Sequence, residues 1–392
     1  MSANSVTVLI PTFNRAAFLV EALDSILAQT RRPDEIIVIN DGSTDDTIER
    51  LEPYKNEIGI LNQDNSGKSA ALNKALGVAK GDLIWVFDDD DIAEPDALET
   101  LLGLLASDPD ADFAYGRHDR FEVQPNGQVT WKDTGYWRKS PPEDFLFETL
   151  LDMFAHQPGM LVRRSLYQKA GPFDESLIRS QDYDMLLRLA QHGRPAPTER
   201  ILFHQRQHDL PRGTAGKVVE VAERNAVWQK NDRKIFAGTF QVLPLGKYLP
   251  TNVSLTGAGM TRRALIRRGI VMGRKNYWKE AGEDFKSAAR ISDPPLTREE
   301  ITDLRQMFMT KYGCDEYLLD RDVQKLFFDI KHASPVGKQM AAAAARAMAW
   351  RVRFALQSGK PLLAFKLASF VIGLIAPYPH ILVGDSSPST RS

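Results

Sequence analysis

Cysteine and long apolar runs are both nearly missing from this sequence. The chain of 392 residues has one cysteine, Cys314, which excludes an internal disulfide framework and any zinc site built from several cysteines. The apolar stretch Leu367–Ala376 has only ten residues, whereas a helix needs about 20 to cross a bilayer. The N-terminus carries no basic region, apolar region and cleavage site of the kind that directs export. These features predict a cytoplasmic protein.

Net charge is also small, but the charges are unevenly distributed along the chain. Residues 1–120 carry 23 acidic and 10 basic side chains, and the remaining residues carry 28 and 40. This asymmetry indicates either different partners for the two halves or an acidic and a basic domain that attract each other. The basic excess is spread over helical patterns without a recognition motif, so we expect no nucleic-acid partner. The length predicts two or three domains.

The first 120 residues alternate strand and helix patterns, which predicts an α/β domain with a mostly parallel sheet covered on both faces. The expected strands are short apolar runs between turn residues: Val6–Pro11, Glu35–Asn40, Ile58–Asn62, Asp82–Phe87 and Asp112–Gly116. Asn14 is expected as the N-cap of the first helix. Residues 117–145 lose the alternation and predict loops or an irregular hairpin. Further along, Gly159–Arg163 reads as a strand, with helices over Phe145–Phe154 and Asp182–His192.

The part of the chain beyond residue 260 predicts an α-helical C-terminal domain. Its expected helices are Arg262–Arg268, Trp278–Ile291, Arg298–Tyr312, Asp320–Ala333 and Gly337–Leu356. We therefore expect a first domain over residues 1–235, a linker at 236–260, a helical domain at 261–380 and a disordered tail at 381–392. The basic and apolar region Met340–Ala376 is either a core helix pair with a solvated basic face or a contact site for a membrane surface.

The sharpest local feature is the run of four carboxylates Asp88, Asp89, Asp90 and Asp91 directly after an apolar strand. Four adjacent carboxylates repel one another unless a cation relieves the repulsion. Ligands bind at the carboxyl ends of strands in open α/β sheets, and oxygen ligands suit Mg²⁺ or Mn²⁺. The alternative is an acidic turn before a helix. Asp41 ends the second strand at the same edge, where it can accept hydrogen bonds from a nucleoside or simply complete its own turn.

Five motifs, taken together, resemble family 2 glycosyltransferases with the GT-A fold over about residues 5–210. They are Pro11-Thr12-Phe13-Asn14-Arg15, Asn40-Asp41-Gly42-Ser43-Thr44-Asp45, Asn65-Ser66-Gly67-Lys68, Asp88-Asp89-Asp90-Asp91 and Gln181-Asp182-Tyr183-Asp184. The resemblance implies an inverting enzyme that takes one sugar from a nucleotide-diphosphate donor, expected to be a UDP-sugar, with Mn²⁺ or Mg²⁺ as cofactor. It also divides the first domain into a donor half, 1–120, and an acceptor half, 121–235.

By this resemblance the donor pocket contains eight residues, which are Thr12, Asn14, Arg15, Asp41, Asn65, Lys68, Asp88 and Asp89. Asp90 is implied as a metal ligand, and His208 of the Arg206-Gln207-His208 motif as a second ligand or a contact to the diphosphate. A phosphate beside Lys68 agrees with the positive end of a helix there. Lys68 and His208 are otherwise ordinary surface residues, and His204 with His208 could form half of a zinc site.

Asp182 matches the family's general base, which removes the proton from the acceptor hydroxyl. The sequence has Gln181 where the family often has Glu, so Asp182 must act alone; otherwise Asp182 is an N-cap. The glycine-containing stretch Gly213–Gly216 predicts a mobile loop that could close over the donor.

The acceptor is expected to be a glycan, a lipid-linked molecule or a protein, in surface glycan or glycoconjugate synthesis. The Gln-x-x-Arg-Trp motif of processive members is missing, which favours addition of one sugar per visit. Two rival functions are a sugar-phosphate nucleotidyltransferase and a non-catalytic nucleotide-sugar-binding module. The first usually has a glycine-rich phosphate loop, which this chain lacks near its first strand.

Overall fold

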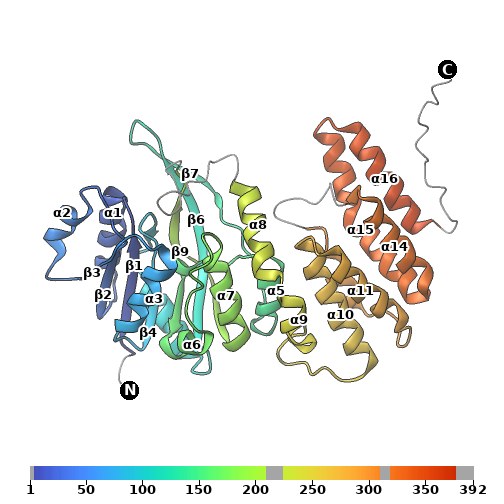
Figure 1. Cartoon of the computed structure of the whole chain (residues 1–392), viewed down its shortest axis with the longest axis horizontal. Helices are drawn as coiled ribbons and strands as arrows, with labels where there is room; N and C mark the ends of the chain where they lie inside the picture. Colours follow the sequence, from blue (N-terminus) through green and yellow to red (C-terminus); the bar gives the residue numbers. More distant parts are fainter. Residues whose placement is uncertain (1–3, 209–223, 310–317, 377–392) are drawn as a thin grey trace. The chain divides into compact units, whose positions relative to one another are not determined.

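A computed structural model of the chain describes residues 4–208, 224–309 and 318–376 (Figure 1). The chain forms two compact units, one of residues 1–239 with 250–252 and one of residues 240–249 with 253–392. The expected loop Gly213–Gly216 and the expected tail at 381–392 lie outside the described residues. The segment expected as a linker contains short helical turns of its own: α9 (Thr239–Val242) and η5 (Leu245–Tyr248).

The first unit is built on one sheet with the strand order β3-β2-β1-β4-β8-β6-β9-β5, to which β7 adds by pairing with β6 (Figure 1). The strands are β1 (Val6–Thr12), β2 (Glu35–Asn40), β3 (Gly59–Asn62), β4 (Leu83–Val86), β5 (Ile92–Ala93), β6 (Phe113–Val123), β7 (Val129–Thr134), β8 (Met160–Arg163) and β9 (Pro195–Arg206). The helices are α1 (Ala16–Leu27), α2 (Thr47–Leu51), α3 (Lys68–Val78), α4 (Ala97–Ser107), α5 (Phe145–Leu151), α6 (Arg164–Ala170), α7 (Gln181–His192) and α8 (Arg224–Phe236), with short turns η1 (Glu52–Tyr54), η2 (Pro142–Asp144) and η3 (Gln157–Gly159).

Strands β3, β2, β1 and β4 are parallel, as their continuous apolar sequences predict. Alternate residues of β1 pack with the apolar stripes of α1 and α4 in one buried core. In the register of the sheet, Thr12 pairs with Asn40 and Leu9 with Val86. The turns after β1, β2 and β4 therefore meet at one edge of the sheet, where the predicted donor residues lie.

The other half of the sheet agrees with the sequence expectation in one place and differs from it in another. Of the loops or irregular hairpin expected for residues 117–145, the structure has the hairpin, formed by β6 and β7 with an irregular register between Asp119 and Phe121. Strand β9 was not expected, because PAPTERILFHQR does not alternate apolar and polar residues. It runs parallel to β6 and antiparallel to the short β5, and so ends beside the four carboxylates.

Two expected N-caps are wrong. Helix α1 begins at Ala16 after Arg15, and Asn14 makes no cap hydrogen bond. Asn14 instead has a φ of 53°, a left-handed conformation that Asn tolerates, and its Oδ1 accepts a hydrogen bond from the Thr44 N–H at 2.7 Å. It thus ties the turn after β1 to the turn after β2. The alternative reading of Asp182 as an N-cap is also wrong, because α7 begins at Gln181 after Ser180.

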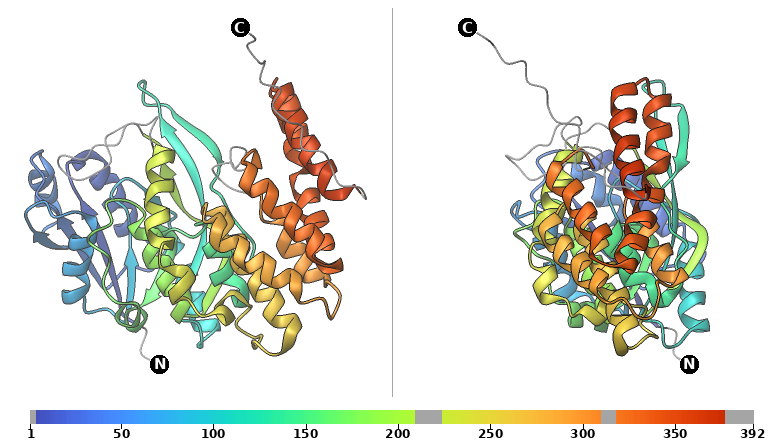
Figure 2. Two further views of the ribbon diagram at one scale, coloured as in Figure 1. Left: turned by 45° about the vertical axis from the view of Figure 1, so that its right-hand side comes forward. Right: turned by 90° about the vertical axis from the view of Figure 1, so that its right-hand side faces the viewer.

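The second unit is helical in its described part, as the sequence predicts. Its helices are α10 (Gly257–Arg274), α11 (Trp278–Arg290), α12 (Arg298–Arg305), α14 (Arg321–Ala333), α15 (Pro335–Gln357) and α16 (Pro361–Ile375). Helices α15 and α16 lie side by side as a hairpin (Figure 2). Across the described residues, every helix is too short or too polar to cross a membrane.

A buried ion pair fixes α12 against α10 in this unit. Both Arg262 and Glu300 are fully buried, and the guanidinium donates to the two carboxylate oxygens at 2.7 and 2.8 Å. Glu300 also completes a capping box, since its carboxylate accepts from the Thr297 N–H and the Thr297 hydroxyl accepts from the Glu300 N–H. Removing the charge of one partner would leave the other charge buried without compensation.

We therefore expect Glu300→Gln to destabilise the protein by about 3 kcal/mol or more, because it leaves the Arg262 charge unbalanced inside the unit. The measurement is urea unfolding followed by circular dichroism. Glu299→Gln is the matched control, because Glu299 precedes Glu300 on the same helix and is exposed. Equal midpoints for the two variants would show that the buried pair contributes little.

Candidate donor and metal site

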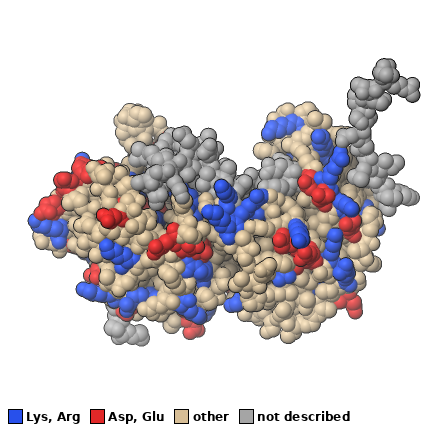
Figure 3. Space-filling model, in the orientation of Figure 1, with Lys and Arg blue, Asp and Glu red and all other residues tan. Residues whose placement is uncertain are grey.

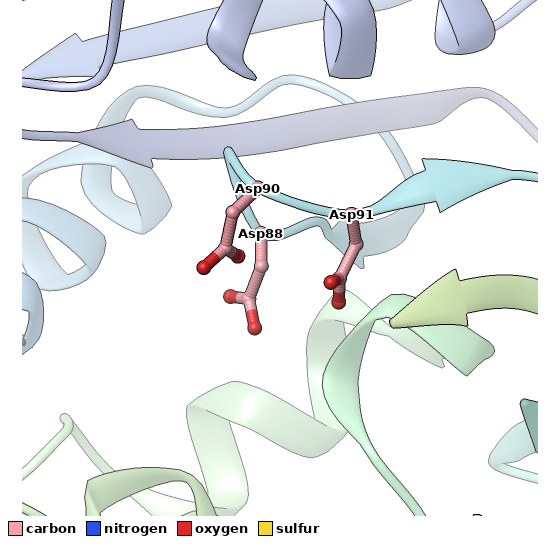
Figure 4. A group of neighbouring side chains, drawn as sticks. All are labelled: Asp88, Asp90 and Asp91. Carbon is pink, nitrogen blue, oxygen red and sulfur yellow. The ribbon is translucent and has the colours of Figure 1, made fainter. Parts of the chain in front are cut away.

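Four carboxylates occupy the turn between β4 and β5, at the edge of the sheet where β1 and β2 also end. Asp89, Asp90 and Asp91 are buried, whereas Asp88 is partly exposed. Carboxylate oxygens of Asp88, Asp90 and Asp91 lie within 4.8 Å of one another, and the three side chains point to the same side of the turn (Figure 4). A compact set of hard oxygen ligands of this kind fits Mg²⁺ or Mn²⁺.

The carboxylates are held by cationic side chains from distant parts of the sequence. Arg15 donates from one nitrogen to Asp89 Oδ1 at 2.8 Å and to Asp90 Oδ2 at 3.0 Å. Thr12 donates to the other oxygen of Asp89 at 2.8 Å. Burial raises the pKa of Asp89 above its ordinary value, although Arg15 acts in the opposite direction. The pKa of Arg15 is also raised, because Asp89 and Asp90 outweigh the effect of its burial. Two predicted donor residues therefore organise the acidic turn itself.

His208 reaches the same cluster from the chain just after β9. Its Nε2 lies 2.9 Å from Asp90 Oδ2, and its ring lies 5.2 Å from the ring of Phe18. His204 has a different partner, Glu94, at 2.8 Å. Since the two histidines contact different carboxylates, they do not form the zinc pair that their spacing suggested. Within the described residues, the only group of three or more side chains arranged to hold a metal is Asp88, Asp90 and Asp91.

Arg206 is the residue of this site to which the sequence motif assigned no role. It ends β9 and is buried, with its guanidinium 4.6 Å from the ring centre of Phe18 and 4.7 Å from that of Phe121. Its Nε donates to the Asp90 carbonyl at 3.0 Å, and its backbone N–H donates to Asp91 Oδ1 at 3.0 Å. Arg206 thus fixes both the backbone and a carboxylate of the acidic turn.

Asp41 is buried and holds the loop that precedes α3. Its Oδ1 accepts from the Gln63 side chain at 2.7 Å and from the Ser66 N–H at 2.8 Å, and its Oδ2 accepts from the Gly67 N–H at 2.8 Å. Gly42 is required beside it, because a Cβ there would lie 2.7 Å from the Asn65 backbone nitrogen. These bonds link the turn after β2 to the loop before α3, whereas the alternative expectation was that Asp41 completes its own turn. The predicted nucleoside contact remains a prediction.

In this loop the side-chain nitrogen of Asn65 is a hydrogen-bond donor without an acceptor among the described residues. This atom, Nδ2, is buried. Buried amide donors in folded proteins are nearly always paired with a protein group or with ordered water, so a water molecule or a ligand would complete the hydrogen bond of this one. Asn65 stands next to the Ser66–Gly67 backbone that Asp41 holds, on the donor side of the acidic turn.

Lys68 begins α3 and joins the donor half to the acceptor half. Its ammonium group forms an ion pair with Asp88. Burial lowers the pKa of Lys68, but the nearby charges of Asp88 and Asp182 outweigh this and raise it above its ordinary value. Asp182 lies in the first turn of α7. The fold therefore brings Asp182, the predicted base, close enough to Lys68, the predicted phosphate contact, for their charges to interact, although the two are 114 residues apart in sequence.

Gln157 is another buried residue to which the sequence analysis assigned no role. It is buried in η3, and neither Oε1 nor Nε2 has a hydrogen-bond partner among the described residues. The turn η3 contacts β4, β6 and β9, and the carbonyl of Pro158 accepts from Trp85 Nε1 at 2.7 Å. Nothing in the sequence around Gln157 marks it, because burial of an amide without a partner is visible only in three dimensions.

We expect Arg206→Lys to destabilise the protein by about 2 kcal/mol, because a lysine cannot replace the charge-assisted bonds to the Asp90 carbonyl and to Glu21 together. Urea unfolding measures this effect. The matched control is Arg200→Lys, which changes an exposed arginine on the same strand and should leave the midpoint unchanged. If Arg206→Lys is as stable as the control, Arg206 does not hold the acidic turn.

Comparison with known proteins agrees with this geometry. The family model described as glycosyl transferase family 2 matches residues 7–171. An uncharacterized glycosyltransferase of Rickettsia typhi is 30% identical over 224 residues, which are 57% of this chain and 70% of that protein. The chondroitin synthase of Pasteurella multocida is 32% identical over 207 residues, 52% of this chain but only 20% of that longer protein.

Among solved structures, that of Staphylococcus aureus TarS residues 1–349 in complex with UDP-GlcNAc aligns with a TM-score of 0.47 and 15% sequence identity, covering 91% of this chain and 92% of that one. The sheet described above, mostly parallel in its donor half and followed by helices, is that of the GT-A fold. The family model and the Rickettsia relative together place the chain: it belongs to glycosyltransferase family 2.

Proposed function

We propose that this chain is an inverting, metal-dependent glycosyltransferase that moves one sugar from a nucleotide-diphosphate sugar, with UDP as the expected nucleotide, to an acceptor hydroxyl. The observation that carries the proposal is the convergence of Lys68, Asp88 and Asp182, which combines a phosphate contact, a metal-binding turn and a base. The name of the Pasteurella multocida relative, chondroitin synthase, supports a glycan or glycoconjugate acceptor, which is a proposal for this chain.

The donor diphosphate is proposed to bind against the acidic turn through a divalent cation. Asp90 would hold the cation, with Asp88 and Asp91 close enough to contribute and His208 against the same carboxylate. A bound cation at this place stabilises the negative charge that grows on the departing diphosphate. Arg15 and Lys68 contribute two fixed positive charges beside it, and neither needs to move a proton.

The nucleoside is proposed to bind over the loop that Asp41 organises. The Asn65 Nδ2 donor is the best-supported contact there, because it is buried and lacks a protein partner among the described residues. Thr12, Asn14 and Asp41 would act mainly through the loops that they hold in place. Sugar hydroxyls of the donor would then lie near Asp88 and Asp89.

On the acceptor side, Asp182 is proposed to take the proton from the attacking hydroxyl, so that the oxygen can form its bond to the anomeric carbon as the diphosphate leaves. Its neighbour Gln181 has an Oε1 that is buried without a hydrogen-bond partner among the described residues. That oxygen can accept a hydrogen bond from a second acceptor hydroxyl but cannot act as a base. A single displacement of this kind needs no covalent nucleophile.

The first test is calorimetric titration of UDP with and without Mn²⁺. We expect binding that requires the cation and is lost in Asp90→Ala, because this change removes a metal ligand. The control is Asp174→Ala, which removes an exposed carboxylate elsewhere in the unit. Cation-independent binding would contradict the metal role, and failure of UDP, TDP, GDP and CDP alike would overturn the proposed transferase function.

The second test separates chemistry from donor binding. Asp182→Asn should keep UDP binding but lower the rate of transfer by about 100-fold or more, because the amide cannot accept the proton. The measurement is UDP release from a UDP-sugar with an acceptor library, and Asp174→Asn is the matched control. Pyrophosphate release from a nucleoside triphosphate and a sugar phosphate would instead indicate a nucleotidyltransferase. Binding without any turnover, unaffected by Asp182→Asn, would indicate a binding module.

A further inference from the structure

The end of α14 and the two helices α15 and α16 have an extreme charge composition. From Lys331, near the end of α14, to Lys366 of α16 the sequence contains seven lysine and arginine residues and no aspartate or glutamate. Two of the seven have internal roles: Lys331 caps the end of α16 by donating to the Gly373 and Ala376 carbonyls, and Arg351 donates to the Phe308 carbonyl. The other five are exposed, and they are Lys338, Arg346, Arg353, Lys360 and Lys366.

Large apolar side chains are exposed between these basic residues. On α15, Trp350 is 46% and Phe354 58% exposed, and their rings contact each other. On α16, Leu362 is 68% and Phe365 66% exposed, and Ile372 follows at helical spacing. Arg346, Trp350 and Phe354 follow one another at intervals of four residues along α15, and Arg353 lies three residues after Trp350, so apolar and basic side chains share one side of the helix. We call the exposed apolar and basic side chains of residues 338–375 the α15–α16 surface.

Exposure to this extent needs an explanation, since α15 and α16 are otherwise well packed. Other apolar residues of the two helices, such as Met348, Leu367 and Phe370, are buried inside the unit. Scattered apolar residues on a surface are ordinary, but several aromatic and aliphatic side chains on two adjacent helices mark an interaction site. Figure 3 shows basic side chains along this part of the second unit, with few acidic ones among them.

We propose that the α15–α16 surface binds an anionic lipid bilayer, lying on it without crossing it. Apolar side chains would enter the boundary between headgroups and acyl chains while the basic side chains remain at the headgroups. The absence of acidic residues matches an anionic surface. A symmetric contact between two copies would place the five exposed cations against five others, which is electrostatically unfavourable. This inference is independent of the proposed sugar transfer.

The experiment is flotation of the full-length chain with vesicles of phosphatidylcholine alone and of phosphatidylcholine with phosphatidylglycerol. We expect binding to the anionic vesicles only, and we expect rising salt to weaken it because screening reduces the attraction between exposed charges. Binding to both kinds of vesicle alike, or to neither, would overturn the proposal. This comparison needs no variant and therefore no assumption about folding.

Two double variants separate the apolar contribution from the charge contribution. Lys360→Glu with Lys366→Glu should reduce the partition coefficient on anionic vesicles at least about tenfold, and Leu362→Ser with Phe365→Ser should do the same through lost burial. The matched charge control is Lys279→Glu with Lys325→Glu, on α11 and α14, which should bind as the wild type does. An equal loss in the charge control and in Lys360→Glu with Lys366→Glu, with no loss in Leu362→Ser with Phe365→Ser, would show that net charge, and not the α15–α16 surface, controls binding.

Sedimentation equilibrium without lipid tests whether the α15–α16 surface binds a second copy of the chain instead of a membrane. The proposal expects the mass of one chain for the wild type and for both test variants. A wild-type dimer that Leu362→Ser with Phe365→Ser returns to a monomer would assign the surface to a second copy and overturn the membrane proposal. Circular dichroism of each variant checks that the helices remain intact.

Discussion

The first unit is organised around the mutual repulsion of four adjacent carboxylates at the end of β4. Such a run is unstable unless positive charge reaches it from several directions. The fold supplies that charge from three places: Arg15 after β1, Lys68 at the start of α3, and Arg206 at the end of β9, whose Nε donates to the Asp90 carbonyl. Each of these side chains belongs to a different segment, so segments that are distant in the sequence meet at the acidic turn. The same arrangement leaves the carboxylate oxygens close enough for one divalent cation.

The sheet explains why those segments meet there. Parallel strands β1, β2 and β4 end at one edge, and the register of the sheet places Thr12 beside Asn40. Strand β9 reaches the same place from the acceptor half by pairing along β6 and then with β5. Because β5 directly follows the four carboxylates, this short pairing links the two halves of the unit at the acidic turn. Stability and the proposed donor binding would therefore depend on the same contacts, and a change at Arg206 is expected to affect both.

Sequence reasoning was sufficient where local chemistry decides the structure. Apolar runs predicted β1, β2 and β4 because strands buried on both faces are mostly apolar, and the carboxylate run marked the turn where the structure groups Asp88, Asp90 and Asp91. The reasoning was insufficient where tertiary contacts decide. Strand β9 has no alternating pattern, and Asn14 was taken for an N-cap although it bridges two turns. The orphaned amides of Asn65 and Gln157 depend on burial by distant segments, which no local pattern reports.

The buried amides without partners among the described residues bear on how the fold can prepare a binding site in the absence of its ligands. An unpaired buried amide lowers the stability of the free protein, and a ligand that completes its hydrogen bonds regains that free energy on binding. Asn65 lies just before α3 and Gln181 precedes the proposed base, so two of the three unpaired amides named above lie beside the proposed donor and acceptor sites, and the third, Gln157, lies in η3. The carboxylate cluster follows the same logic, since repulsion among Asp88, Asp90 and Asp91 is relieved most fully by a divalent cation. The donor would then pair the amide of Asn65, the acceptor would pair that of Gln181, and the cation would reduce the repulsion among the carboxylates. Each binding event would remove one unfavourable contribution to the free energy of the unliganded protein.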